Sequence, residues 1–281
     1  MSRARALAAS LPEELHLLPY VAAYEWRKAT AFRAGFVLNA LLRGVPRPVV
    51  MTLVYLAMFR STGAAEIRGY TFVDLVHFLV WTAAIQKCIP DWRSLDLAEQ
   101  IFDGYVTKYL VMPVSYFTLL WGRFLQFTAV QLLAAAAFWC AGALVLHSWW
   151  PQPVSAVALA QAATLLALGT GCYLLTYFIL NCLAFWLDVV WSLLNMFMFV
   201  AAFMSGMLVP VALMPRAVRG VLEVTFPYWT VNAPVELLLG RLGPADFRFG
   251  LAVLATSFVA LHALAFVTWR RGLRRYAGVG T

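Results

Sequence analysis

The stretch that decides the fold is QKCIPDWRSLDLAEQIFDGYVTKYLVMPVS, residues 86–115, which interrupts a chain that is otherwise strongly apolar. It carries seven charged residues from Lys87 to Lys108, whereas the segments on both sides are apolar enough to cross a bilayer. We refer to residues 86–115 as the bracket. A short, charged and structured connection between two apolar segments is typical of a membrane protein that presents it to a soluble partner.

The composition excludes a soluble globular protein. Hydrophobic residues make up 63% of the chain, charged residues only 12%, and the mean hydropathy is +0.79. A soluble domain with so few charges could not cover its surface. The basic opening residues lack an uninterrupted apolar core, so no cleavable signal peptide is expected. The four cysteines lie in or beside apolar stretches without CxxC spacing, which favours buried thiols over a metal site or a disulfide.

Six apolar stretches come close to or exceed the roughly 20 residues that a helix needs to span the hydrocarbon core. Strands of a membrane barrel would show short alternating segments instead, so the sequence predicts an all-α integral membrane protein with six transmembrane helices. Arg43, Pro46, Arg47 and Pro48 interrupt the first stretch and leave its start open. The predicted spans are Phe36–Phe59, Phe72–Ile89, Phe117–Leu146, Val154–Cys182, Val189–Val209 and Phe247–Trp269.

The distribution of Lys and Arg predicts the orientation of these helices. With six spans both termini lie on one side, and the segments of that side carry twelve Lys and Arg against six on the other. This favours cytoplasmic termini and a cytoplasmic bracket. The chain is expected to form a single domain, residues 1–281, with an N-terminal region of residues 1–35, a bundle of residues 36–269 and a basic tail of residues 270–281.

The segment YVAAYEWRKATAFRAG after Pro19 combines aromatic and basic residues, which predicts an interfacial helix in the headgroup layer. A solvated tail beside the membrane is the alternative. Further upstream, Ser10 and Glu13 have the spacing of a capping box.

The bracket has its own helical pattern. Ser94 can cap a helix whose first turn carries Asp96 and Glu99, and Gly104 offers a stop or a kink. The apolar residues recur at helical spacing and are Leu95, Ala98, Phe102 and Tyr105. We expect this apolar stripe to dock on a partner; an amphipathic helix lying on lipid headgroups is the alternative.

Residues 205–243, which we call the cap segment, are too long and apolar for a solvated connection and are punctuated by prolines. Two short helices are expected, Pro215–Thr225 and Ala233–Leu239. Non-helical backbone at membrane depth must be buried in protein or line a cavity, so the cap segment is expected to close a pathway. A surface hairpin without a gating role is the alternative.

Catalytic and cofactor motifs are absent from the sequence. It contains no GxxxxGK[ST], HExxH, GxSxG or GxGxxG, so neither catalytic nor metal-binding residues are assigned. Arg43 and Arg47 lie four apart and are candidates for contact with an anionic substrate or with lipid phosphates. Asp74 and His77 are three residues apart on one helix face. They are expected to form a hydrogen-bonded pair at the membrane interface, with a proton relay as the alternative.

Two loose patterns in the bracket and the cap segment carry a resemblance to a known family. A run of Ile, Gly, Leu and Pro before the third span falls on Ile101, Gly104, Leu110 and Pro113. After the fifth span a run begins with Ser-Gly and continues with spaced prolines, the third of which follows a Phe. Its positions are Ser205, Gly206, Pro210, Pro215, Phe226, Pro227 and Pro234. Together with Phe185 and Trp186 before the fifth span, these patterns are similar to ABC transporter permeases of the type-2 exporter class, in the branch of ABC-2-family transporter proteins.

This resemblance implies a half-transporter in a bacterial inner membrane. Two permeases, identical or sisters, would pair with each other and with two separate ATPase subunits that bind ATP and Mg²⁺. The bracket would be the coupling helix and the cap segment the extracellular gate, with membrane lipid as the other partner and no nucleic acid. A secondary transporter, which would show inverted repeats, and a non-transporting membrane scaffold are the alternative classes.

The predicted orientation can be tested with topology reporters. A reporter fused after Thr281 and one placed near Ser94 should both report the cytoplasm, whereas one near Gln152 should report the exterior, because the Lys and Arg bias fixes these sides. A cytoplasmic signal near Gln152 would remove the arrangement with six spans.

Overall fold

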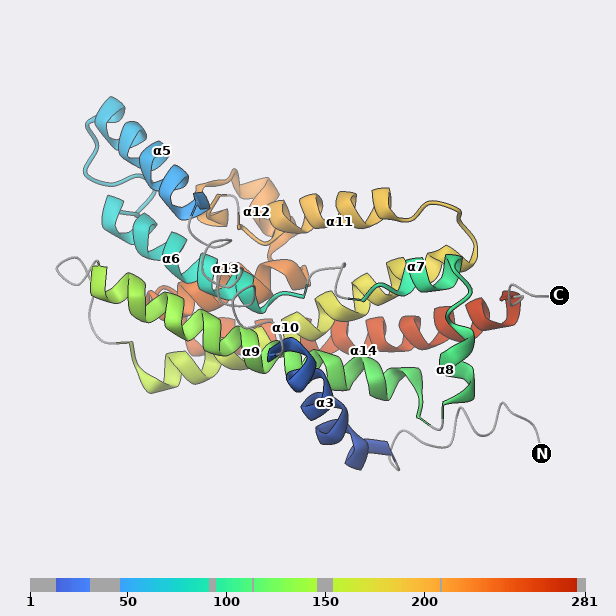
Figure 1. Cartoon of the computed structure of the whole chain (residues 1–281). Coiled ribbons are helices and arrows are strands. Elements are labelled where there is room, and N and C mark those ends of the chain that lie inside the picture. Colours follow the sequence, from blue (N-terminus) through green and yellow to red (C-terminus); the bar gives the residue numbers. More distant parts are fainter. Residues whose placement is uncertain are drawn as a thin grey trace.

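The computed structural model describes residues 14–30, 46–90, 95–112, 114–145, 154–207 and 209–276. Within these ranges the chain forms helices joined by turns, and its only β-type pairing is an isolated bridge between Ile67 and Tyr70. Figure 1 shows an elongated bundle in which the long helices lie roughly side by side. The helices are η1 (Leu15–Leu17), α3 (Leu18–Thr30), α5 (Pro46–Thr62), α6 (Phe72–Cys88), α7 (Leu97–Phe102), α8 (Thr107–Val111), α9 (Tyr116–Val145), α10 (Ala156–Cys182), η4 (Leu183–Phe185), α11 (Trp191–Met204), η5 (Val211–Leu213), α12 (Arg216–Leu222), α13 (Phe226–Leu238) and α14 (Pro244–Arg275).

The all-helical prediction is confirmed for the described residues, and each of the six apolar stretches contains a helix. Three helices are long and apolar enough to cross a membrane, namely those over Tyr116–Ala137, Ala156–Phe185 and Pro244–Arg275. The apolar parts of α5 and α11, Pro48–Thr62 and Trp191–Met204, are shorter. The number of six spans therefore stays a prediction.

Several predicted boundaries differ from those observed. The first described helix of the bundle begins at Pro46, where the proline fits the first turn, and residues 36–45 lie outside the described part. The fifth helix ends at Met204, short of the predicted Val209. The last helix continues to Arg275, so the first six residues of the predicted basic tail are helical. Arg274 and Arg275 in that last turn stabilise the negative end of the helix dipole.

A helix, α3, lies where the interfacial helix is predicted, since it covers Leu18–Thr30 and packs against α9; its interfacial position stays a prediction. Its side chains Tyr20 and Tyr24 are largely exposed, as aromatic residues of the headgroup layer are. The capping-box pair Ser10 and Glu13 lies outside the described residues.

Helix α10 lies at the centre of the bundle and packs against α13 and α14. Glycines allow these close approaches: a Cβ at Gly169 of α10 would overlap Thr230 of α13. A Cβ at Gly250 of α14 would in the same way overlap the indole of Trp229. Small residues that let helices approach are a common device of membrane bundles, where apolar burial alone gives little driving force.

An aromatic cluster fixes the end of the bundle that carries the bracket. The ring of Tyr116 stacks on Trp269 with a centroid distance of 4.7 Å and meets the edge of Tyr109 at 5.0 Å. Phe178 of α10 lies 5.7 Å from the same Tyr116 ring. The N-terminus of α9 and the C-terminal parts of α10 and α14 are thereby held together with the bracket helix α8, since such ring pairs contribute about 0.5–1.5 kcal/mol each beyond their burial.

The glycine contacts can be tested by adding one methyl group. Gly250→Ala should lower the apparent melting temperature of the protein in detergent, because overpacking a filled core costs about 1–3 kcal/mol. Gly220→Ala is the matched control, since no atom lies within 4 Å of its added Cβ; it should leave stability unchanged or raise it slightly. Equal melting temperatures for the two variants would show that α13 does not need the close approach.

Candidate functional site

Two regions at opposite ends of the bundle hold the residues singled out in the sequence. The bracket helices α7 and α8 lie at the right-hand end in Figure 1, near the C-terminus, and the cap segment lies in the left half.

The bracket folds as two short helices separated by a glycine turn. Helix α7 begins at Leu97 with Asp96 as its N-cap, so the prediction that Ser94 caps it is wrong; Ser94 itself lies outside the described residues. Asp96 has φ 47° and its side chain forms no capping hydrogen bond. Gly104 has φ +77°, which confirms it as the stop of the first helix. The chain then continues as α8 instead of one longer helix.

The predicted apolar stripe divides into a buried and an exposed part. Leu95, Ala98 and Ile101 are buried in the core that α9, α10 and α14 form, so they are not available to a partner. Phe102 and Tyr105 are exposed over 44% and 61% of their surface. At the end of α8, Val111 is 80% exposed and Met112 44%. These four residues form the exposed apolar face of the bracket.

Two hydrogen bonds from distant parts of the chain hold the bracket in place. The Ala98 N–H donates to Oδ1 of Asn181 at 3.1 Å, and Nδ2 of Asn181 donates to the Tyr177 carbonyl at 2.8 Å. The Tyr276 hydroxyl donates to the Gly104 carbonyl at 2.7 Å. Asn181 is 2% exposed, and an amide buried at the end of an apolar helix is costly unless it is bonded in this way. The bracket is therefore attached to the ends of α10 and α14.

Asn181 and Tyr276 were not among the residues predicted from the sequence. A lone amide in the apolar run FILNC was the available signal for Asn181. Of the other bracket residues, Leu110 lies in α8, whereas Pro113 lies outside the described residues. Arg43 also lies outside them, and Arg47 lies in the first turn of α5.

The cap segment contains three short helices, η5, α12 and α13. The first expected helix agrees with α12, but the expected Ala233–Leu239 is wrong at its start, because α13 begins seven residues earlier, at Phe226. Pro227 fits the first turn, where its missing N–H costs nothing, and Pro234 is accommodated inside the helix. Residues 227–237 are buried without exception, so α13 is a packed helix and the alternative of a surface hairpin does not hold for it.

The predicted proline and glycine positions fix the path of the chain around α13. Gly206 has φ +71° and ends the turn after α11, where Ser205 is completely buried. Pro210 and Pro215 directly precede η5 and α12. Oδ1 of Asn232 accepts from the Val211 N–H at 3.2 Å, which joins this loop to α13.

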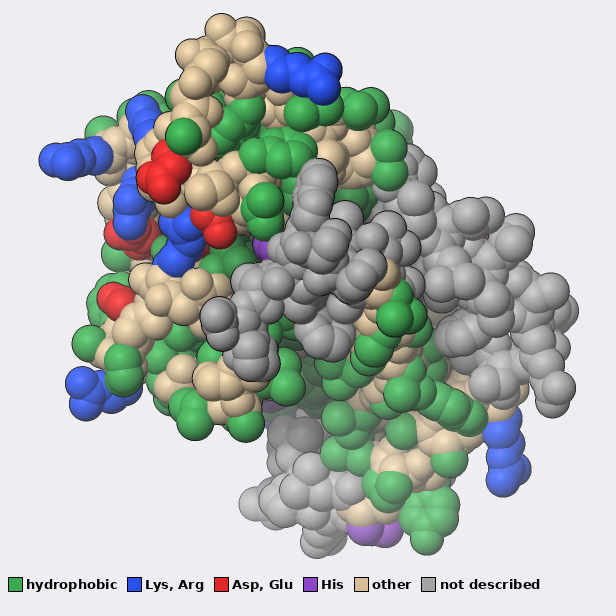
Figure 2. All heavy atoms as spheres, turned by 90° about the vertical axis from the view of Figure 1, so that its left-hand side faces the viewer, with side chains coloured by type: hydrophobic (Ala, Val, Ile, Leu, Met, Phe, Trp, Pro, Cys, Tyr) green, Lys and Arg blue, Asp and Glu red, His purple; other side chains and the backbone are tan. Residues whose placement is uncertain are grey.

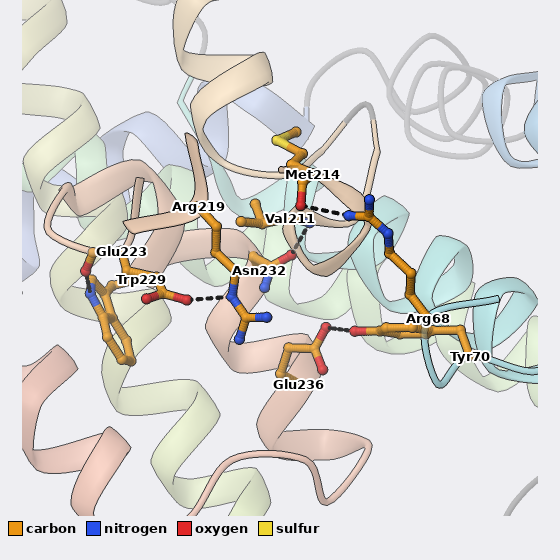
Figure 3. Close-up of polar contacts among 9 residues, drawn as sticks. All are labelled: Arg68, Tyr70, Val211, Met214, Arg219, Glu223, Trp229, Asn232 and Glu236. Carbon is orange, nitrogen blue, oxygen red and sulfur yellow. Dashed lines mark hydrogen bonds and ion pairs between the residues drawn. The ribbon is translucent and has the colours of Figure 1, made fainter. Parts of the chain in front are cut away.

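A tight turn in the connection between α5 and α6 forms hydrogen bonds to the cap segment. This turn was not predicted from the sequence. Ile67 and Tyr70 exchange backbone hydrogen bonds around Arg68 and Gly69, which have φ 52° and 79°. Two consecutive positive φ values are typical of the type I′ turn. Arg68 Nη1 donates to the Leu213 carbonyl at 2.8 Å and to the Met214 carbonyl at 2.7 Å; the second bond is drawn in Figure 3. We call residues 67–74 the latch.

The latch makes a second contact with α13 and its end. The Tyr70 hydroxyl donates to the Glu236 carboxylate (Figure 3). Arg241 Nη2 donates to Asp74 and to the Gly69 carbonyl, both at 3.0 Å, and its guanidinium lies 3.8 Å from the centre of the Tyr70 ring. Asp74 also caps α6 together with Thr71, and its predicted pairing with His77 stays a prediction.

These residues enclose a cavity of about 210 Å³ between the latch, η5, α12 and α13. Figure 2 shows acidic and basic side chains gathered on one part of this end of the molecule, beside apolar surface. Burial raises the pKa of the Glu236 carboxyl, and the Tyr70 hydroxyl and the Arg241 charge counteract this effect in part. The available signals in the sequence were the dipeptide Arg-Gly and a lone Glu in an apolar run.

The latch can be opened without breaking its turn. Arg68→Asn keeps a residue that tolerates positive φ before Gly69 but removes the two hydrogen bonds to the cap segment. Hydrogen exchange of the amides in residues 209–215 should become faster by about tenfold, the equivalent of roughly 1.4 kcal/mol from charged hydrogen bonds that are partly exposed. Arg60→Asn at the end of α5 is the control. Unchanged exchange in Arg68→Asn would mean that the turn does not hold the cap segment in place.

Comparison with known proteins gives the family. The sequence model described as ABC-2 family transporter protein matches residues 47–280, which include the bracket, the latch and the cap segment. The comparison with curated proteins found no match. Because the match covers most of the chain and the long helices are apolar, this multi-pass membrane protein belongs to the ABC-2 family of transporter proteins.

Proposed function

We propose that this chain is the permease subunit of an ATP-driven ABC exporter in a bacterial cytoplasmic membrane. It forms the translocation pathway with a second permease, identical or a sister protein with six spans, and two separate ATPase subunits bind ATP and Mg²⁺. Residues 1–281 act as one permease domain with both termini and the bracket in the cytoplasm. The chain itself carries no catalytic residues in this proposal.

The exposed apolar face of the bracket is the observation that carries the proposal. Phe102, Tyr105, Val111 and Met112 stand out from the end of the bundle, while the residues beneath them are buried in the chain's own core. Exposed aromatic and Met side chains on a fixed base are the residues that interface centres favour. An ATPase groove that covers these residues would remove their apolar surface from water. Because the bracket is already held in place, binding would cost little conformational entropy.

The attachment of the bracket suits the transmission of a motion. Asn181 joins it to the end of α10, and Tyr276 joins it to the end of α14. The same two helices hold α13 through the contacts at Gly169 and Gly250. A displacement of the bracket would therefore act on both helices that support the cap segment.

The cap segment is the gate in this proposal, with the latch as its closing contact. Ser205, Gly206, Pro210 and Pro215 set the loop that Arg68 holds through the Leu213 and Met214 carbonyls. Opening would break a few hydrogen bonds and would leave the buried face of α13 in place. The charged side chains around the cavity are three Arg and one Glu. This excess of positive charge suits substrates with an anionic group.

The bracket can be tested by placing one charge on its exposed face. Phe102→Asp should abolish recovery of the ATPase subunit in a pull-down from detergent extracts, because an unpaired charge in an apolar groove costs about 2–5 kcal/mol. Gly104→Val should act in the same direction, since valine is strained at φ +77°. Tyr20→Asp is the matched control, as an exposed aromatic residue of α3 outside the bracket.

The ATPase subunit in this experiment is the co-expressed protein whose hydrolysis the permease stimulates. All three variants should insert into the membrane as the unchanged chain does, because none of the changed residues lies in a long apolar helix. Recovery of the ATPase and transport at the unchanged level for Phe102→Asp would mean that the bracket rests on lipid. ATP hydrolysis by the purified chain alone would refute the division of labour between the subunits.

A further inference from the structure

A second cavity, of about 260 Å³, lies at the bracket end of the bundle, between α3, α7, α8 and α9. One water molecule needs only about 10–15 Å³ of such space, so this cavity can take a larger polar group. It is separate from the exposed apolar face of the bracket, since neither Phe102 nor Tyr105 lines it. Its polar lining is divided between hydrogen-bond donors and acceptors.

The donors come from α8 and α9. Nζ of Lys108 lies 4.8 Å from the centre of the Tyr109 ring and forms no ion pair with the described residues. Arg123 Nε donates to Glu25 at 3.1 Å, and the Arg123 side chain also hydrogen-bonds the Tyr109 hydroxyl, which still leaves N–H groups for a further partner. The buried Tyr109 hydroxyl accepts from Arg123 and keeps its own O–H to donate.

The acceptors come from α7 and its N-cap. Asp96 and Gln100 lie four residues apart, on the same face of this helix. Oε1 of Gln100 is buried, and the described part of the chain offers it no hydrogen-bond partner. The Asp96 side chain is exposed and does not cap the helix. Buried polar atoms without partners are rare in proteins, and this oxygen belongs to a residue that lines the cavity.

The charges around the cavity balance. Glu25 and Asp96 are acidic, and Lys108 and Arg123 are basic, so the lining favours a ligand without net charge that presents an anion to one wall and a cation to the other. Helix α3, which supplies Glu25 to the cavity, carries Tyr20 and Tyr24 with 73% and 68% of their surface exposed, as aromatic residues at the level of the lipid headgroups are.

We propose that this cavity binds the phosphoethanolamine headgroup of a membrane phospholipid. Lys108, Arg123 and Tyr109 donate hydrogen bonds to the phosphate, and Asp96 and Gln100 accept them from the primary ammonium. A phosphocholine group has no N–H to offer the two acceptors, and a phosphoglycerol group leaves the Asp96 charge unpaired. The bound lipid joins the bracket to α3 and α9, so the lipid composition acts on the position of the bracket.

The proposal does not depend on the proposed function, because it can be tested on the purified chain without an ATPase. The protein is exchanged in detergent into equimolar phosphatidylethanolamine, phosphatidylglycerol and phosphatidylcholine, and retained lipid is measured by native mass spectrometry. Phosphatidylethanolamine should be retained in preference to both others. Lys108→Gln should reduce its retention about tenfold, the effect of one lost charged hydrogen bond, and Asp96→Asn should abolish the preference over phosphatidylglycerol.

Arg270→Gln is the matched control, because Arg270 is an exposed cation in the last turns of α14 and does not line the cavity. Lys108 and Asp96 are exposed, so all variants should melt at the same temperature. Equal retention of the three lipids, or unchanged retention in Lys108→Gln, would overturn the proposal. Displacement of the lipid by soluble glycerophosphoethanolamine at equal concentration would assign the cavity to a water-soluble phosphate ester instead and would overturn the lipid assignment.

Discussion

The close approach of α13 to α10 and α14 is the constraint on which the rest of the structure depends. A short helix of 13 residues reaches about 20 Å, too little to cross a bilayer, so its backbone and side chains must be covered by protein. Gly169 and Gly250 provide this cover because they lack the Cβ that would overlap Thr230 and Trp229. Once α13 is seated, Asn232 and Glu236 are fixed, and with them the loop of η5 and the partner of the latch.

Helix α10 connects this packing to the other end of the molecule. Gly169 and Asn181 lie twelve positions apart (169 to 181) on one helix without an intervening proline, about 18 Å along its axis. The helix is therefore a continuous body between the contact that seats α13 and the amide that holds the bracket. Two sites that the sequence shows as separate motifs thus share one structural element.

The sequence predicted the elements of the bracket but not which of their faces are free. Helical spacing indicates that Leu95, Ala98, Phe102 and Tyr105 share a side, yet it says nothing about what covers them. In the structure Leu95 and Ala98 are buried in the chain's own core, whereas Phe102 and Tyr105 are exposed. The prediction of a stop at Gly104 succeeded because a positive φ is a local property of glycine.

The latch could not be predicted for the same reason that the bracket's faces could not. Arg68 and its acceptor Leu213 are 145 residues apart, and a single sequence carries no signal of such a pairing. The prolines of the cap segment did predict where regular structure breaks, since a missing N–H acts locally. The start of α13 was missed because Pro227 can equally end a helix or begin one.

The strength of the latch follows from its surroundings. The pair Arg219–Glu223 is substantially exposed, and ion pairs of this kind contribute at most about 1 kcal/mol. The bond from Tyr70 to the buried Glu236 is made where fewer waters compete, so it outweighs the exposed pair, and a charged hydrogen bond of this type contributes about 1.5–3 kcal/mol. Arg68 is itself exposed, and its bonds to the two carbonyls contribute less because water competes for them. The latch is thus attached to the cap segment by few bonds, whose strength is of the same order as the coupling free energies of about 1–3 kcal/mol that a distant binding event commonly transmits.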